Sequence, residues 1–152
     1  MLKKFIGFAV LMVLLMGMVA GCGTKKAETV KIGFIGPLTG GNAAIGIGLK
    51  NSAELAVKQA NESGKYKTKF ELVVADDGGD PSTAVSAANK LIADKGVVAV
   101  FGHFNSGAAL ATVPIFHKNG MPILVTAAIH PDITKGQFKE VTRIMTAANV
   151  QN

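Results

Sequence analysis

The stretch DPSTAVSAANKLIADKGVVAVFGHFNSG, residues Asp80–Gly107, contains the signals for a helix, a strand and a polar loop in direct succession. Asp80 offers a helix-capping side chain, Pro81 suits the first helical position, and Gly96 supplies a stop. Between them, apolar residues recur at helical spacing: Ala84, Val85, Ala88, Leu91 and Ile92. Residues 97–101 then contain no polar side chain, which is typical of a strand inside a parallel sheet. The stretch predicts one helix–strand unit of an α/β fold.

The same alternation continues in both directions from this unit. Further strands are expected at residues 30–35, 70–75, 122–126 and 141–145, and further helices at 47–63 and 106–119. Pro114 predicts a kink or a late start in the last helix. The apolar strands at 97–101 and 122–126 suit burial on both faces. The order of elements predicts a doubly wound parallel sheet.

Composition and charge narrow the possible functions. The chain has 152 residues, of which 49% are hydrophobic and 17% charged, so it has the material for one globular domain. The formal net charge is +6, and it falls to +4 without Lys3 and Lys4, because 14 basic residues then face 10 acidic ones. The other lysines are scattered and form no basic face with interleaved aromatic residues. We therefore expect no binding to nucleic acid.

The first 21 residues have the pattern of an export signal. Lys3 and Lys4 precede an apolar stretch of 14 residues, Phe5–Met18, which is shorter than the roughly 20 residues of a membrane-spanning helix. Cys22 is the single cysteine and follows the sequence VAG, which resembles a bacterial lipobox. This predicts acylation of Cys22, removal of residues 1–21 and a tether at 22–29. A free cysteine beside an ordinary cleavage site is the alternative.

The sequence argues against several cofactor sites. Gly33, Gly36 and Gly40 lack the dinucleotide-binding spacing, and no phosphate-binding loop motif occurs. The segment 76–80, DDGGD, lacks the ligand spacing of a calcium loop and is interpreted as a turn with a helix cap. His117 and His130 show no metal-ligand spacing. We expect no cofactor and no metal.

Three loops, at residues 36–42, 102–106 and 127–131, follow predicted strands and therefore lie at the carboxyl edge of the sheet, where such folds bind ligands. Ser106 and Gly107 begin a predicted helix, whose free amides attract a small carboxylate. The alternative is that Ser106 only caps its own helix. His103 is expected to shape the loop. A serine hydrolase using Ser106 and His103 is a further alternative, but no G-x-S-x-G motif is present, so we assign no catalytic residue.

Four features carry a resemblance to a known family. The blocks KIGFIGPLTGGNAAIG (31–46), DDGGDPSTAVSAANKLIADKGVVAVFGH (76–103) and PILVTAAIHPDIT (122–134), together with the lipobox, resemble the branched-chain amino-acid-binding lipoproteins of ABC importers. Those proteins have the type I periplasmic-binding-protein fold. The resemblance implies two α/β lobes that close around a solute and deliver it to a permease. Because family members are more than twice as long, residues 30–152 correspond to most of a first lobe.

The resemblance also implies roles for particular residues. Ser106 takes the place of the carboxylate-binding serine, and Ala127 that of the backbone carbonyl facing the ligand's ammonium group. Ile129 stands where a hydroxyl residue is usual, and Ile45 where an aromatic residue often covers the ligand. The expected ligand-binding residues lie in the loops at the carboxyl edge and beside them: Ile45, His103, Ser106, Gly107, Ala127 and Ile129.

The resemblance implies a solute-binding component of an ABC importer, exported and anchored to the membrane by lipid. The implied partners are a small solute and an ABC permease, and the protein is expected to be a monomer without enzymatic activity. An amino acid of the branched-chain type is the first expectation for the ligand. A small amide, another carboxylate, or a ligand-sensing role at a membrane receptor are the alternatives. A single lobe covers only part of a ligand, so weak or undetectable binding is expected from this piece.

Overall fold

The computed structural model describes residues 28–148. The expected leader, Cys22 and most of the tether lie outside these residues, as does the chain from residue 149 onward. Among the described residues no helix combines the length and the apolar character needed to cross a membrane.

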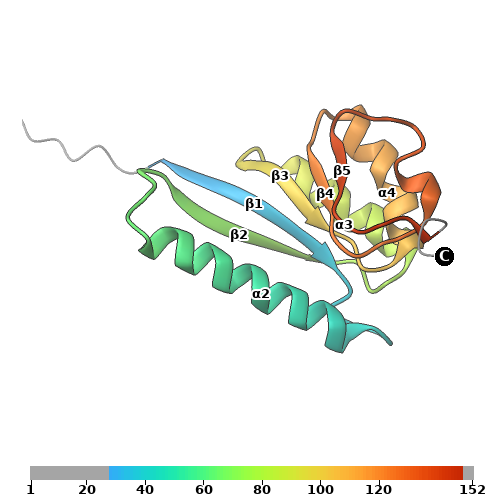
Figure 1. The fold of residues 1–152 in the computed structure, drawn as a ribbon, viewed down its shortest axis with the longest axis horizontal. Coiled ribbons are helices and arrows are strands. Elements are labelled where there is room, and N and C mark those ends of the chain that lie inside the picture. Colours follow the sequence, from blue (N-terminus) through green and yellow to red (C-terminus); the bar gives the residue numbers. More distant parts are fainter. Residues whose placement is uncertain (1–27, 149–152) are drawn as a thin grey trace, which may run out of the picture.

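The described chain folds into one parallel sheet with helices between the strands, as predicted (Figure 1). The strand order is β2-β1-β3-β4-β5. The strands are β1 (Thr29–Gly36), β2 (Lys69–Asp76), β3 (Val97–Gly102), β4 (Ile123–Val125) and β5 (Val141–Arg143). The helices are α2 (Ala43–Glu62), α3 (Pro81–Ala93) and α4 (Ser106–Lys118), with a short 3-10 turn η1 (Pro131–Ile133).

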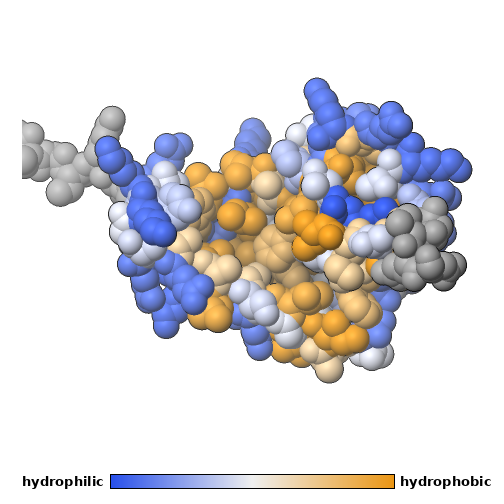
Figure 2. All heavy atoms as spheres, viewed as in Figure 1, coloured by the Kyte–Doolittle hydropathy of each residue, from blue (hydrophilic) through white to orange (hydrophobic). Residues whose placement is uncertain are grey.

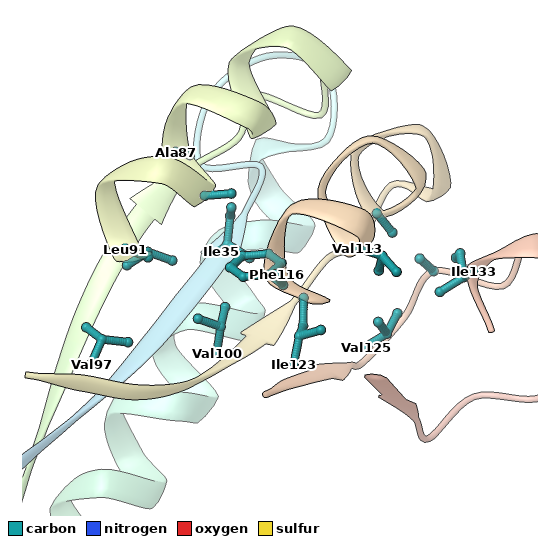
Figure 3. Packing of buried hydrophobic residues seen from close by; sticks show 13 residues of the cluster. Ile35, Ala87, Leu91, Val97, Val100, Val113, Phe116, Ile123, Val125 and Ile133 are labelled. Atoms are coloured by element: carbon teal, nitrogen blue, oxygen red, sulfur yellow. The ribbon is translucent and has the colours of Figure 1, made fainter. Parts of the chain in front are cut away.

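The core lies between the sheet and the pair α3 and α4. Figure 3 shows side chains from β1, β3 and β4 pointing toward those of the two helices. The buried members include Ile35, Leu91, Val100, Phe116 and Ile123. Burial of such side chains contributes about 1.5–3 kcal/mol each, so this cluster is the main source of stability.

Helix α2 covers the opposite face, but only over β1 and β2. The prediction that β3 and β4 are buried on both faces is therefore wrong for the described chain. Val98 on β3 is 53% exposed and Leu124 on β4 is 38% exposed. Phe101, which pairs with Leu124 in the sheet, has its ring centroid 5.4 Å from that of Phe34 on β1. Figure 2 shows apolar side chains gathered on this side of the molecule, beside α2.

Helix α3 agrees with the prediction, whereas α2 begins earlier than predicted and α4 lacks the late start that Pro114 suggested. The Asp80 carboxylate accepts a hydrogen bond from the Thr83 amide at 2.8 Å and so caps α3. Helix α4 begins at Ser106 and continues past Pro114, so the expectation of a late start is wrong. Helix α2 begins four residues before the predicted position. Its first turns include Gly46, whose low helix propensity argues against a helix when only local sequence is considered.

Candidate functional site

The parallel strands bring their carboxyl ends to one edge, where the predicted loops 36–42, 102–106 and 127–131 lie together. From β1 the chain continues to β2 on one side, and then returns to β3 on the other side. Between β1 and β3 the loops therefore diverge, which is the position where doubly wound sheets bind ligands.

Asp76, the last residue of β2, holds the first of these loops. Its carboxylate accepts hydrogen bonds from the Leu38 amide at 2.7 Å, the Thr39 hydroxyl at 2.7 Å and the Gly78 amide at 2.8 Å. Burial alone would raise the pKa of this carboxyl group, but the hydrogen bonds from Thr39, Gly78 and Leu38 outweigh it and lower the pKa. The ionised side chain thus fixes the position of the loop at residues 36–42, the glycine-rich loop.

The next residue, Asp77, holds the loop after β3. It is fully buried, and its carboxylate bonds to Nδ1 of His103 at 2.7 Å and accepts from the Gly79 amide at 2.8 Å. The segment 76–80 is accordingly a turn followed by a helix cap, as interpreted from the sequence. No group of three or more metal-ligating side chains occurs among residues 28–148.

His103 lies at the centre of this edge. Its ring is fully buried, with Nδ1 bonded to Asp77 and Nε2 bonded to the Thr112 hydroxyl at 2.7 Å. Its carbonyl oxygen accepts from the amides of Ala127 at 3.2 Å and Ala128 at 3.1 Å. The expectation of a ligand contact from the His103 side chain is therefore wrong, because both ring nitrogens already bond within the protein. These hydrogen bonds agree with the expectation that His103 shapes the loop.

Ser106 connects the loops after β3 and β4. It is the first residue of α4, and its hydroxyl oxygen accepts from the His130 amide at 3.3 Å. The alternative that Ser106 caps its own helix is wrong, since Asn105 occupies the capping position. The first bond of the helix runs from the Ala109 amide to the Asn105 carbonyl, so the amides of Ser106 and Gly107 precede the helical ladder.

This arrangement contains no hydrolase dyad. The Ser106 hydroxyl contacts the His130 amide, whereas the ring of His103 bonds to Asp77 and Thr112. The alternative of a serine hydrolase built on Ser106 and His103 is therefore wrong.

The remaining predicted site residues lie on two loops. Ala127 and Ile129 follow β4 and are partly buried; the amide of Ala127 bonds to His103, and the carbonyl of Ile129 accepts from Ala148 at 3.0 Å. Ile45 is in the first turn of α2, beyond the glycine-rich loop, and is 47% exposed. The hydrogen bond between Ser106 and His130 thus connects Ser106 to the loop that contains Ala127. Ile45 belongs to a different element, helix α2.

Two histidines have partners of their own. Nδ1 of His117 bonds to the Glu140 carboxylate at 2.6 Å, and its ring stacks on Phe138 with centroids 4.1 Å apart. The hydrogen bond from His117 lowers the pKa of Glu140. Nδ1 of His130 accepts from the Asp132 amide at 3.2 Å and caps η1. These contacts agree with the structural interpretation of both histidines.

Sequence reasoning missed three residues that organise the edge: Asp77, Thr112 and Arg143. Arg143 donates to the carbonyl of His130 at 2.8 Å and so ties β5 to the loop after β4. It is the single arginine of the chain, which was the available clue to a special role. Asp77 and Thr112 gave no local signal, because their common partner His103 is 26 and 9 residues away in sequence.

A groove of about 300 Å³ lies between β2 and α3 and includes Val73, Ser86 and Lys90 in its wall. None of the predicted ligand-binding residues lines it. The candidate site is instead an open edge formed by loops and the start of α4.

This lobe has polar loops at the carboxyl edge of a parallel sheet, at the position where the loops after β1 and β3 diverge. The amides of Ser106 and Gly107, which precede the hydrogen-bond ladder of α4, lie at the same edge. This is the design of a ligand-binding lobe. The chain matches the periplasmic binding protein family over residues 29–146, and it belongs to that family.

Individual relatives support this assignment. The chain is 39% identical over 127 residues to the Leu/Ile/Val-binding protein homolog 2 of Brucella abortus, a match that covers 83% of this chain and 34% of the relative. Among solved structures, it resembles the branched-chain amino acid transporter substrate-binding protein LivJ of Streptococcus pneumoniae in complex with isoleucine. The TM-score is 0.74 and the identity 30%, over 79% of this chain and 34% of LivJ.

A second solved structure broadens the range of ligands among the relatives. It is a solute-binding protein of an ABC transporter from Rhodopseudomonas palustris in complex with 3,4-dihydroxybenzoic acid. The TM-score is 0.69 and the identity 30%, over 78% of this chain and 32% of that protein. The chain thus spans about a third of the length of the relatives it matches. The relatives are solute-binding proteins, not enzymes.

Proposed function

We propose that this chain is the first lobe of an extracytoplasmic solute-binding component of an ABC importer, anchored to the membrane through Cys22. Its ligand is a small carboxylate, with a branched-chain amino acid as the first candidate, and its partner is an ABC permease. A relative in complex with isoleucine and another in complex with 3,4-dihydroxybenzoic acid support a carboxylate as the common element.

The contact between Ser106 and His130 is the observation that carries the proposal. It brings the start of α4, with its early amides, to the loop that contains Ala127. A carboxylate there receives hydrogen bonds from the Ser106 hydroxyl and from the Gly107 amide, and the helix dipole favours its charge. The carbonyl of Ala127 supplies an acceptor for an ammonium group on the same ligand.

The proposal leaves Ile45 and Ile129 as apolar walls. Neither side chain offers a hydrogen bond, so they favour the hydrocarbon part of a ligand over a polar one. A small amide fits the same donors with a weaker attraction, since hydrogen bonds to a charged group contribute about twice as much as neutral ones.

Titration calorimetry at millimolar ligand tests this proposal. The purified protein is titrated with L-leucine, L-isoleucine, L-valine, 3,4-dihydroxybenzoate and leucinamide. We expect binding of at least one carboxylate, and weaker binding of the amide. Ser106→Ala removes a hydrogen bond to a charged group, which contributes about 1.5–3 kcal/mol, so its affinity should fall by about 10- to 150-fold.

Ser82→Ala is the matched control, because Ser82 is an exposed serine in the first turn of α3 and is not one of the proposed ligand contacts. This variant should bind like the unmodified protein. Absence of heat with every carboxylate, or equal affinity for Ser106→Ala and Ser82→Ala, would contradict the proposal.

A further inference from the structure

We propose that His103 is the positioning residue of the ligand-binding edge: through Asp77 and Thr112 it fixes the loop after β3, and through its carbonyl it fixes the loop after β4. The claim that His103 holds these two loops in position rests only on hydrogen bonds among the described residues. The consequence for ligand affinity rests on the proposed function.

The side chain of His103 joins three separate elements. Asp77 belongs to the turn after β2, His103 to the loop after β3, and Thr112 to the middle of α4. All three residues are fully buried, and both bonds to the imidazole ring measure 2.7 Å. A ring held at two opposite nitrogens cannot rotate, so its backbone is held with it.

The backbone around His103 extends the connection to a fourth element. The carbonyl of His103 accepts the amides of Ala127 and Ala128, and the neighbouring carbonyl of Gly102 accepts the Thr126 amide at 3.2 Å. Three successive amides after β4 therefore bond to two successive carbonyls, those of the last residue of β3 and of the residue that follows it. The proposed acceptor for the ligand, the Ala127 carbonyl, belongs to this same bonded segment.

Each polar atom of the network has a partner. The second carboxylate oxygen of Asp77 accepts from Gly79, and the hydroxyl of Thr112 also lies 2.9 Å from the carbonyl of Ala108. Removing one group leaves a buried atom unpaired, which costs far more than losing an exposed hydrogen bond. The order carboxylate, imidazole, hydroxyl resembles a proton relay, but its complete burial keeps any substrate away, and its role is positional.

Amide hydrogen exchange measured by NMR on the purified protein tests this role. Thr112→Val keeps the shape of the side chain and removes the hydroxyl that bonds to His103. We expect the amides of Ala127 and Ala128 to exchange about 5- to 100-fold faster, the range expected when a buried hydrogen bond is left unmade. The amides of Ile32 and Phe34, on central strand β1, should stay within about twofold of the unmodified protein.

Two further variants separate positioning from general damage. Thr112→Ser restores the hydroxyl and should return the Ala127 and Ala128 amides to slow exchange. Thr142→Val makes the same chemical change at an exposed position on β5 and should leave those amides unchanged. Uniform acceleration of all amides in Thr112→Val, or unchanged exchange at Ala127 and Ala128, would overturn the proposal.

A ligand titration gives the second readout. With L-leucine or 3,4-dihydroxybenzoate as the probe, Thr112→Val should bind at least about fivefold more weakly, and Thr112→Ser should bind like the unmodified protein. If the unmodified protein binds neither probe while the exchange pattern is as expected, the proposed function fails for these ligands and the positional role of His103 stands. If the unmodified protein binds a probe and Thr112→Val binds it equally well, the consequence for ligand affinity is overturned.

Discussion

Substitution of Gly46 by alanine should loosen the glycine-rich loop of the site, whereas the same substitution at Gly48 should stabilise the protein. Both glycines lie near the start of α2. A Cβ atom at Gly46 would overlap the carbonyl oxygen of Pro37 and lie 3.1 Å from Cγ of that ring. A Cβ atom at Gly48 would meet nothing within 4 Å. The two substitutions are therefore the same chemical change in the same helix, and they differ in whether the added methyl group overlaps a neighbouring residue.

The expected magnitudes follow from two opposing contributions. Replacing glycine by alanine inside a helix stabilises it by about 1 kcal/mol. At Gly46 the overlap involves a backbone oxygen, which no side-chain rotation can relieve, and such overpacking costs about 1–3 kcal/mol or more. We expect Gly46→Ala to lower the free energy of unfolding by up to about 2 kcal/mol and Gly48→Ala to raise it by about 1 kcal/mol. The two melting temperatures should then differ by roughly 10 °C.

Thermal and urea unfolding followed by circular dichroism measure both variants against the unmodified protein. Because Pro37 begins the loop that Asp76 holds through Leu38 and Thr39, exchange of those two amides should also accelerate in Gly46→Ala. A Gly46→Ala protein as stable as Gly48→Ala would refute the reasoning, since it would show that the contact with Pro37 exerts no constraint.

The carboxylates of Asp76 and Asp80 should each affect stability, the first through its pKa and the second by capping α3. Because its hydrogen bonds lower the pKa of Asp76 in the folded protein, its contribution is complete above the ordinary value of 3.8 and is lost as the pH falls through the lowered pKa. Asp76→Asn should therefore show a flatter fall in urea midpoint between about pH 5 and 3 than the unmodified protein, and parallel curves would contradict this assignment. Asp80→Ala should cost about 0.5–2 kcal/mol at neutral pH, measured by urea unfolding, because it removes the cap of α3. Asp80→Asn keeps an acceptor for Thr83 and should cost less; equal losses would argue against capping.

Local patterns were sufficient for the elements whose signals lie next to one another in the chain. Helix α3 has its cap, first proline and apolar spacing within residues 80–96, and the structure places it accordingly. The start of α2 was missed because Gly46 counts against a helix when only local propensity is considered. Its reason lies in the contact with Pro37, nine residues earlier, which no window of helical periodicity contains.

The same distinction explains what could be predicted of the site. Parallel strands bring their carboxyl ends to one edge, so the loops containing Ser106 and Ala127 could be placed together from the order of elements. The burial of His103 could not, because it depends on Asp77 and Thr112 meeting in space. An apolar run such as residues 97–101 likewise indicates burial without stating whether one face or both are covered, and β3 is covered on one.

The positions of the apolar core and the polar network indicate separate physical roles. The apolar cluster around Leu91 and Phe116 lies between the sheet and helices α3 and α4. Its side chains stabilise the fold because they are buried. Buried polar groups such as Asp77 and His103 contribute little net stability, since apolar replacements of similar volume are often neutral or better. What they add is direction, because a hydrogen bond fixes an angle that an apolar contact leaves free. The network lies where three loops meet, beside the core residues Ala109 and Ala128. Substitutions in the core should therefore change mainly the free energy of unfolding, whereas substitutions in the network should also change the positions of the loops.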